Sequence, residues 1–242
     1  FVPDTTFIRT SSLYYDDLYA YNELIYESSP LNRVVAQFGP GTAWRSANRP
    51  TRTTYLTNSD IAELSCRILK IAGTKATPNL DTSNGIYPNG SLHVTKFTSE
   101  DNAVTYTFTD MLGQQLLIRS VDGDKLLDTY YVYDDLGNLC FVLPPMLSAS
   151  LGTSDFADDL EQYAYQYRYD QQNRCTGKKL PGTDWTYHIY DKGDNLLFSQ
   201  DGEQRKNSQW TFMLYDCLKR PTVTGYCKGQ FTAEQFGNLL PY

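Results

Sequence analysis

The segment Tyr130-Tyr-Val-Tyr-Asp-Asp-Leu-Gly-Asn-Leu-Cys-Phe-Val-Leu-Pro-Pro145 has the pattern of a β-hairpin. Residues 130–133 favour a strand because aromatic and β-branched side chains fit a pleated sheet. Residues 134–138 predict a tight turn, and residues 139–143 predict the return strand. The two prolines then end the strand pairing, since proline has no backbone N–H to donate. Weaker copies of this segment occur before and after it.

The turn at residues 134–138 can be explained by the residue types at its positions. Asp134 can accept a hydrogen bond from the backbone N–H two residues later. Gly137 stands three residues later, where a hairpin turn needs a left-handed backbone. Glycine adopts that conformation freely, and Asn and Asp tolerate it. The rule is therefore an aromatic residue, Asp, two variable residues, then Gly, Asn or Asp, and then a polar residue such as Asn138.

Further copies of this pattern recur at an interval of roughly two dozen residues, the size of one two-stranded unit plus its connection. The residues at its turn positions are Asp110, Gly113, Tyr133, Asp134, Gly137, Asn138, Tyr169, Asp170, Asn173, Tyr190, Asp191, Tyr215 and Asp216. Two copies depart from the rule, because Thr109 precedes Asp110 and Glu27 replaces Asp in the unit at residues 26–33. Units of this size bury their apolar faces only by stacking on neighbours.

The sequence predicts a mainly β protein of consecutive antiparallel hairpins that form a curved, wound sheet with short helix insertions. We treat residues 1–242 as one repeat segment with an irregular part at 1–102 and denser repeats at 103–225. A short terminal helix is expected at 232–239, where Thr232 and Gln235 form a capping box. We expect a polar loop at 73–91. This loop is the best candidate for an internal domain boundary, but the repeats continue across it and we do not divide the chain there.

Two more helices are expected inside the chain. The clearest is an inserted helix at 154–164, with Ser154 as its cap and acidic residues in its first turns. A shorter helix is expected to begin at Ser59, which can also act as a cap.

Composition and charge exclude some classes of function. The net charge of −7 argues against binding to nucleic acid or to an anionic membrane surface. Mean hydropathy is −0.48, yet 40% of residues are hydrophobic and 20 are tyrosine, which suits strands with packed aromatic rings. No apolar run is long enough for a transmembrane helix and no signal peptide is present. Because the chain begins at Phe1, we interpret it as a piece of a longer polypeptide.

No pattern of metal ligands or cofactor residues is present, so we expect neither a metal nor a cofactor. The five cysteines have wide spacings and form no Cys-x-x-Cys pair. His93 and His188 stand alone, without the spacing of a zinc site. Residues 122–128 contain three acids near a glycine, but a calcium-binding EF-hand needs a longer loop that ends in Glu.

The ordered set of Tyr-Asp units resembles the YD repeats of Rhs proteins, and in particular the Rhs-type proteins of Bacteroidetes. The resemblance covers most of residues 13–225. It is carried by residues 29–34, 131–139, 167–170 with 173–174, 179–182, 190–191 and 215–216. No segment matches the aspartyl self-cleavage region of that family, and Asp216 is followed by Cys217 instead of the proline-containing pattern.

This resemblance implies strand-turn-strand units wound into a β-sheet shell of a secreted or cell-surface polypeptide. Such a shell can enclose a variable C-terminal toxin or present an adhesive surface. The implied partner is the remainder of the parent polypeptide, with further repeats and a C-terminal toxin, and no nucleic acid.

The repeated residues also have competing interpretations. The aspartates could be catalytic carboxylates, but their recurrence at one turn position favours a structural role. The tyrosines could stack on sugars, although cross-strand packing is the simpler interpretation. Trp44, Trp185 and Trp210 are candidate ligand contacts in the same sense. No Gly-x-Ser-x-Gly nucleophile motif is present.

We therefore expect a non-catalytic structural section of an Rhs-type shell. The alternative is a carbohydrate- or protein-binding adhesion module that uses exposed Tyr and Trp, and an enzyme is the third possibility.

Overall fold

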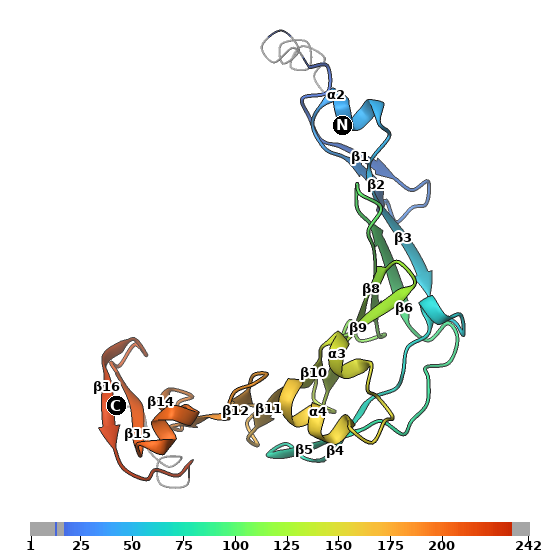
Figure 1. Cartoon of the computed structure of the whole chain (residues 1–242). Coiled ribbons are helices and arrows are strands. Elements are labelled where there is room, and N and C mark those ends of the chain that lie inside the picture. The colour runs from blue at the N-terminus through green and yellow to red at the C-terminus, as the bar shows by residue number, and fades with distance from the viewer. Residues whose placement is uncertain (1–12, 14–16, 234–242) are drawn as a thin grey trace. The chain divides into compact units, whose positions relative to one another are not determined.

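The computed structural model describes residues 13 and 17–233. It confirms the mainly β fold, with a long antiparallel sheet of 14 strands in the order β1-β2-β3-β6-β7-β8-β9-β10-β11-β12-β13-β14-β15-β16 (Figure 1). Strands β4 and β5 form a separate two-stranded sheet. Neighbours in the long sheet are also neighbours in the chain, apart from this inserted hairpin, as expected for consecutive hairpins.

The chain divides into two compact units. The first contains Phe1–Cys66 and Ile86–Asp128, and the second contains Arg67–Gly85 and Thr129–Tyr242. Strand β9 (Lys125–Tyr133) begins in the first unit and ends in the second. The inserted hairpin is therefore part of the second unit, although its sequence lies between two segments of the first.

The first unit has six complete strands and two short helices. They are β1 (Glu23–Tyr26), β2 (Val34–Phe38), β3 (Thr51–Thr57), β6 (His93–Thr98), β7 (Val104–Thr109), β8 (Gln115–Asp122), α2 (Thr42–Ser46) and the 3₁₀-helix η1 (Ala62–Leu64). Its core lies on one face of the central strands, where Val94 pairs with Phe108 and Phe108 pairs with Leu117. These three side chains are almost fully buried. In β7 and β8 buried residues alternate with half-buried ones, which matches the two-residue period of a strand.

A buried arginine fixes η1 in the first unit. Arg119 is 4% exposed, and its guanidinium donates to both carboxylate oxygens of Asp128 at 2.7 and 2.6 Å. Its Nη1 donates to the carbonyls of Ala62, Glu63 and Ser65 at 2.7–3.0 Å. Bonds to several acceptors are what a buried guanidinium needs to offset its desolvation.

The expected Ser59 helix is only partly correct. Only the three-residue η1 forms, and Ile61 occupies its N-cap without a side-chain bond. The Ser59 hydroxyl is buried and has no hydrogen-bond partner among the described residues. The carbonyls that would continue this helix accept from Arg119 instead, which explains why the element stays short.

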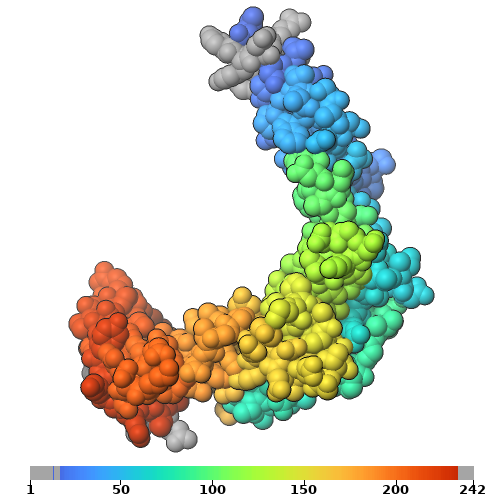
Figure 2. All heavy atoms as spheres, viewed as in Figure 1, coloured from blue at the N-terminus to red at the C-terminus, as the bar shows by residue number. Residues whose placement is uncertain are grey.

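The second unit contains most of the dense repeats. Its strands are β10 (Leu139–Leu143), β11 (Tyr165–Tyr169), β12 (Cys175–Lys179), β13 (Thr186–Tyr190), β14 (Leu196–Gln200), β15 (Gln209–Tyr215), β16 (Pro221–Lys228), β4 (Lys70–Thr74) and β5 (Thr77–Asp81). Figure 2 draws this unit in two colour ranges, turquoise for the inserted segment Arg67–Gly85 and yellow-green to red for the described residues from Thr129 onward.

The expected loop at 73–91 is wrong in its first part, because β4 and β5 pair there through a turn at Lys75 and Ala76. Pro78 and Asn79 suggested a loop, but a two-stranded hairpin has no central strand whose ladder a proline could break. A tertiary contact also holds the tip, since the N–H of Tyr169 donates to the Lys75 carbonyl at 3.0 Å.

The helices of the second unit differ from expectation in their caps. The inserted helix forms as α4 (Phe156–Tyr163), but its N-cap is Asp155 and not Ser154. The Ser154 hydroxyl donates to the Asp155 carboxylate instead. Two short helices, α3 (Pro145–Ser148) and α5 (Gly202–Lys206), were not predicted, although Asp201 and Gln204 form a capping box that marks the start of α5.

Two further points concern the described residues only. Apart from Thr232 and Ala233, the expected terminal helix at 232–239 lies outside them. Within the described part of the chain, no helix has the length and apolarity needed to cross a membrane.

Candidate functional site

The repeated turns share one backbone arrangement. In the turn that begins at Asp134, the Asp134 N–H donates to the carbonyl of Asn138, and the N–H of Gly137 donates to the Asp134 carbonyl. The turns that begin at Asp110, Asp170, Asp191 and Asp216 have the same two bonds at the same positions. Two backbone hydrogen bonds therefore close each turn within its own five residues.

The aspartate carboxylate closes each turn. In Asp191, Oδ1 accepts from the N–H of Gly193 at 2.8 Å and from the N–H of Asn195 at 2.9 Å. Its Oδ2 accepts from the Asn195 side-chain amide at 2.8 Å. The same Oδ2 bond comes from Asn138, Arg174 and Arg220 in other turns. The polar residue at the end of the sequence rule is thus the partner of the second carboxylate oxygen.

The position three residues after the acid has a left-handed backbone in every one of these turns. The φ angles are 85° at Gly113, 82° at Gly137, 64° at Asn173, 64° at Asp194 and 60° at Lys219. Lys219 departs from the rule of Gly, Asn or Asp, so this turn carries backbone strain.

The sequence also predicts a turn at residues 99–102, and the structure shows that this turn is a further copy of the same arrangement, with Ser99 in place of Asp. The Ser99 N–H donates to the Ala103 carbonyl, and the Ser99 carbonyl accepts from the N–H of Asn102. The Ser99 hydroxyl accepts from the N–H of Ala103 at 3.1 Å. Asn102 has the left-handed backbone, with a φ of 63°. A hydroxyl is a shorter acceptor than a carboxylate, and Ser in place of Asp would have found this copy in the sequence.

The tyrosine before the aspartate connects one hairpin to the previous one. The hydroxyl of Tyr169 donates to the Leu139 carbonyl at 2.8 Å, and that of Tyr190 donates to the Cys175 carbonyl at 2.9 Å. The hydroxyl of Tyr215 donates to the Leu196 carbonyl at 3.0 Å. Each acceptor is the first residue of the return strand in the preceding hairpin.

Burial raises the pKa of all three of these tyrosines. Each hydroxyl therefore keeps its proton and acts as a donor. We refer to these three hydrogen bonds as the tyrosine locks.

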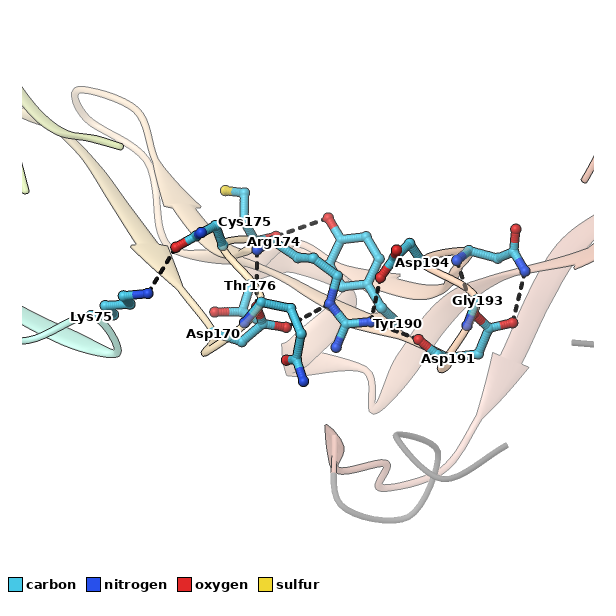
Figure 3. Close-up of polar contacts among 12 residues, drawn as sticks. Lys75, Asp170, Arg174, Cys175, Thr176, Tyr190, Asp191, Gly193 and Asp194 are labelled. Carbon is cyan, nitrogen blue, oxygen red and sulfur yellow. Dashed lines mark hydrogen bonds and ion pairs between the residues drawn. The ribbon is translucent and has the colours of Figure 1, made fainter. Parts of the chain in front are cut away.

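Side chains also join one turn to the next. The Asn138 amide donates to Asn173 Oδ1 at 3.1 Å. Arg174 Nη1 donates to the Asp191 carbonyl at 2.6 Å (Figure 3). Lys219 Nζ donates to the Gly193 carbonyl at 2.6 Å. We refer to the turns 134–138, 170–174, 191–195 and 216–220, all within the second unit, as the turn row.

The tip of the β4–β5 hairpin joins the turn row as well. Lys75 Nζ donates to Asn173 Oδ1 at 2.8 Å, a contact between residues 98 positions apart in the chain (Figure 3). The inserted hairpin therefore braces one turn of the row through both its backbone and a side chain.

The aspartates of the turn row do not have the environment of catalytic acids. Hydrogen bonds from Arg220 hold the pKa of the Asp216 carboxyl below its usual value. Asp191 is 4% exposed, and its carboxylate accepts three bonds from within its own turn. A general acid at neutral pH needs a raised pKa and a bond left for substrate. No group of three or more potential metal ligands occurs among the described residues.

A shallow cavity of about 370 Å³ lies beside the turn row. Its lining includes Asp170, Arg174, Thr176, His188 and Tyr190, and contains neither serine nor cysteine. His188 Nδ1 is buried and has no hydrogen-bond partner among the described residues, and burial lowers the pKa of this imidazole. The only acid there, Asp170, accepts from two backbone N–H groups and from Arg174. The Asp170 carboxylate is therefore already engaged within its own turn.

The three tryptophans have different environments. Trp44 on α2 is 41% exposed, whereas Trp210 is 6% exposed and packs against Phe198 and Phe231. The expected role of Trp210 as a ligand contact is therefore wrong, because its ring belongs to a core. Trp185 is half-buried, and the Arg168 guanidinium lies 3.8 Å from its ring centroid and covers one face.

The remaining candidate residues carry no reactive arrangement. None of the described cysteines Cys66, Cys140, Cys175, Cys217 and Cys227 forms a disulfide with another described residue. His93 is exposed and lies in β6 of the first unit, and Asp128 is bound by Arg119. The acids at 122–128 are therefore not brought together as a calcium site.

Comparison with known proteins identifies relatives by family and by fold. Residues 3–57 match the family described as Domain of unknown function (DUF6443). A search among curated proteins found no match. The structure is similar to that of the Photorhabdus luminescens Tc holotoxin pore with a TccC3 variant, with a TM-score of 0.55 and 12% identity. That match covers 92% of this chain and 9% of the other chain.

A second similar structure is the TcdB2–TccC3 crystal structure, with a TM-score of 0.46 and 12% identity over 85% of this chain and 10% of the other. This chain thus spans about a tenth of the chains it resembles. The family match and the holotoxin likeness support an Rhs-like fold.

Proposed function

We propose that this chain is a non-catalytic section of the wall of an Rhs-type β-sheet shell in an exported or cell-surface polypeptide. The observation that carries the proposal is the repetition of the tyrosine lock in three successive hairpin pairs. A bond that recurs at the same position between neighbouring units extends a sheet, and it does not form a single site. In repeat proteins such nearest-neighbour interfaces provide most of the stability.

The fold likeness supports this role. The segment of the Tc holotoxin pore that this chain resembles is a small part of a much larger chain. We propose in the same way that the partners of this segment are further repeats of its own parent polypeptide, of the Bacteroidetes type that the sequence resembles. The shell of the complete polypeptide would enclose or present a C-terminal toxin outside the producing cell.

The test uses the complete parent polypeptide and limited proteolysis. If this segment is wall, replacing Tyr169, Tyr190 and Tyr215 with Phe should expose the enclosed C-terminal region to protease, because all three locks are removed. The control is Tyr187→Phe, whose hydroxyl has no hydrogen bond among the described residues. Equal protection in the triple variant and in the control would contradict the proposal.

Binding to a glycan or a surface protein is the second candidate, and one observation favours it. Trp44 exposes 41% of its surface on α2, so an aromatic face is accessible to a sugar ring. A glycan array with the intact chain, compared with Trp44→Ala, tests this function. Binding that is the same in both proteins, or no binding at all, would remove Trp44 as the contact.

A further inference from the structure

Strand β16 is the last strand of the sheet in the described part of the chain (Figure 1). Its inner edge pairs with β15 over the full length of both strands, whereas its outer edge pairs with no described strand. Large apolar side chains of β16 are accessible to solvent, since Val223 is 48% exposed and Tyr226 is 70% exposed. A free strand edge offers unpaired backbone groups to another strand.

The hairpins of the second unit meet in one fixed register. Residues seven and eight positions after one aspartate pair with residues four and five positions before the next. The observed pairs are Phe141 with Gln166, Val142 with Tyr165, Gly177 with Tyr187, Lys178 with Thr186, Phe198 with Phe212 and Ser199 with Thr211. Three interfaces thus have the same register although their side chains differ. We therefore attribute the register to the backbone pairing and to the tyrosine lock.

Applied to the last hairpin, this register identifies the positions on β16 that would receive a further strand. Counting from Asp216, these are Val223 and Thr224. The carbonyl that corresponds to Leu139, Cys175 and Leu196 is that of Pro221. No tyrosine among the described residues donates to it.

Two arginines at equivalent positions support the same conclusion independently. Arg174 and Arg220 each donate Nε to the aspartate four residues earlier, at 2.7 Å. Arg174 also reaches the next turn, where Nη1 meets Asp191 and Asp194, and its side chain is 19% exposed. Arg220 has no next turn among the described residues, and its side chain is 71% exposed. The last turn therefore has the arginine that connects successive turns, but no next turn lies beside it among the described residues.

We propose that the outer edge of β16 binds a strand of one further Tyr-Asp hairpin, in the register that the three inner interfaces define. The residue four positions before the incoming Asp pairs with Val223, the incoming Tyr donates to the Pro221 carbonyl, and Arg220 contacts the incoming turn. This inference rests on the proposed wall function and adds the chemistry and register of the partner. The occupant is a hairpin of the same repeat, because only that element has been seen to fit this interface.

Disulfide trapping with a peptide tests the register on the intact chain. The protein carries Val223→Cys together with Cys217→Ser and Cys227→Ser. The probe is a synthetic peptide of residues 185–200, which contains the strand β13, Tyr190 and Asp191 but no cysteine of its own. With Tyr187→Cys in the peptide, the paired Cα atoms lie within disulfide range.

The expected result is faster trapping by the Tyr187→Cys peptide than by a His188→Cys peptide, by at least about ten-fold, because residue 188 faces the other side of the strand. Adding Tyr190→Phe to the Tyr187→Cys peptide should reduce trapping about five-fold, since one hydrogen bond is lost. Replacing Arg220 with Met should also reduce it. A control protein with Cys217→Ser and Cys227→Ser, in which Val223 is retained, measures the trapping that comes from the other cysteines.

A second peptide keeps the test decisive if the first does not form a hairpin. It contains residues 165–179 with Gln166→Cys and Cys175→Ser. Trapping that does not depend on register, or no trapping with either peptide, would overturn the proposal. Disulfide-linked dimers of the protein alone, in preference to the peptide product, would assign the edge to a second copy of this chain. The proteolysis test of the wall leaves β16 unchanged, so the two proposals can fail separately.

Discussion

The hydroxyl of Tyr190 in β13 donates a hydrogen bond of 2.9 Å to the carbonyl of Cys175, the first residue of β12. The bond crosses from one hairpin to the previous one, and two neighbouring pairs of hairpins repeat it. The tyrosine of the sequence motif therefore acts on the preceding repeat, whereas the aspartate beside it acts within its own turn. The Tyr-Asp dipeptide thus both joins neighbouring hairpins and closes the turn of its own hairpin.

Tyr190→Phe removes this lock and keeps the ring. We expect a loss of about 1 kcal/mol in the local free energy of opening, because the Cys175 carbonyl loses a buried donor. Hydrogen exchange of the amides in β12 and β13 measures it. Tyr187→Phe is the matched control in the same strand and should change exchange by less than about 0.5 kcal/mol. Equal effects in both variants would show that the lock contributes nothing.

Asp134 and Asp135 are adjacent carboxylates with different roles. Asp134 accepts from the N–H groups of Leu136 and Asn138 and from the Asn138 amide, whereas Asp135 is exposed. Asp134→Ala should destabilise the β9–β10 hairpin by about 1–3 kcal/mol, because three hydrogen bonds to a charged acceptor are lost. Asp135→Ala should be near neutral. Urea unfolding followed by hydrogen exchange in the hairpin compares the two, and a reversed order would refute the turn mechanism.

Gly113 tests the left-handed position without a steric complication. Its φ is 85°, and a Cβ built there would meet no atom within 4 Å. Gly113→Ala should therefore cost about 1–2 kcal/mol from backbone strain alone. Gly39→Ala is the control, because Gly39 does not have a left-handed backbone and its nearest contact would be at 4.0 Å. Thermal unfolding of the two variants should separate them clearly, and similar melting temperatures would contradict the prediction.

Arg119 should be the most sensitive charged residue of the first unit. Arg119→Met leaves the Asp128 carboxylate without its cation and frees the carbonyls of Ala62, Glu63 and Ser65, so we expect a loss of about 3–5 kcal/mol. Arg49→Met is the surface control, since Arg49 lies 4.0 Å from exposed Asp101 and should contribute less than about 1 kcal/mol. Chemical unfolding monitored in the first unit measures both. A small effect at Arg119 would mean that water replaces its contacts.

Cysteine reactivity checks the burial pattern. Desolvation raises the pKa of the Cys66 thiol to about 12 and that of Cys140 to about 11, and both side chains are buried. Cys217 is exposed. A thiol reagent at pH 8 should therefore modify Cys217 first and leave Cys66 and Cys140 unmodified until the protein unfolds, because the thiolate is the nucleophile. Mass spectrometry of the labelled peptides identifies the order, and early labelling of Cys66 would refute this burial.

The same shifts predict a loss of stability at high pH. The pKa of Cys66 in the folded protein lies above the unfolded value near 9. The stability that depends on keeping this thiol protonated is therefore fully present below about pH 9. It is then lost as pH rises from about 9 toward 12. Cys66→Ala should weaken this alkaline dependence in unfolding experiments, while Cys217→Ala leaves it unchanged.

Local sequence predicted the repeated turns well, because each depends on residues within five consecutive positions. Asp191, Gly193 and Asn195 make all their turn bonds with one another, so a single sequence window contains the whole interaction. The turn at residues 99–102 was also predicted, but it was not recognised as a copy of the repeat because a serine hydroxyl supplies the acceptor there. The helix caps were less predictable, since Ser154 and Asp155 compete for one position and both can cap a helix.

The sequence by itself determined the hairpins and the residues that close each turn, since these bonds are formed within one short segment. Only the tertiary structure decided which carbonyl receives the Tyr190 hydroxyl, that Trp210 is buried, and that the 67–85 hairpin belongs to the second unit. These outcomes depend on the register between strands and on packing between segments far apart in the chain. No local pattern encodes them, because the free energy of a strand pair depends on the partner as much as on the strand itself.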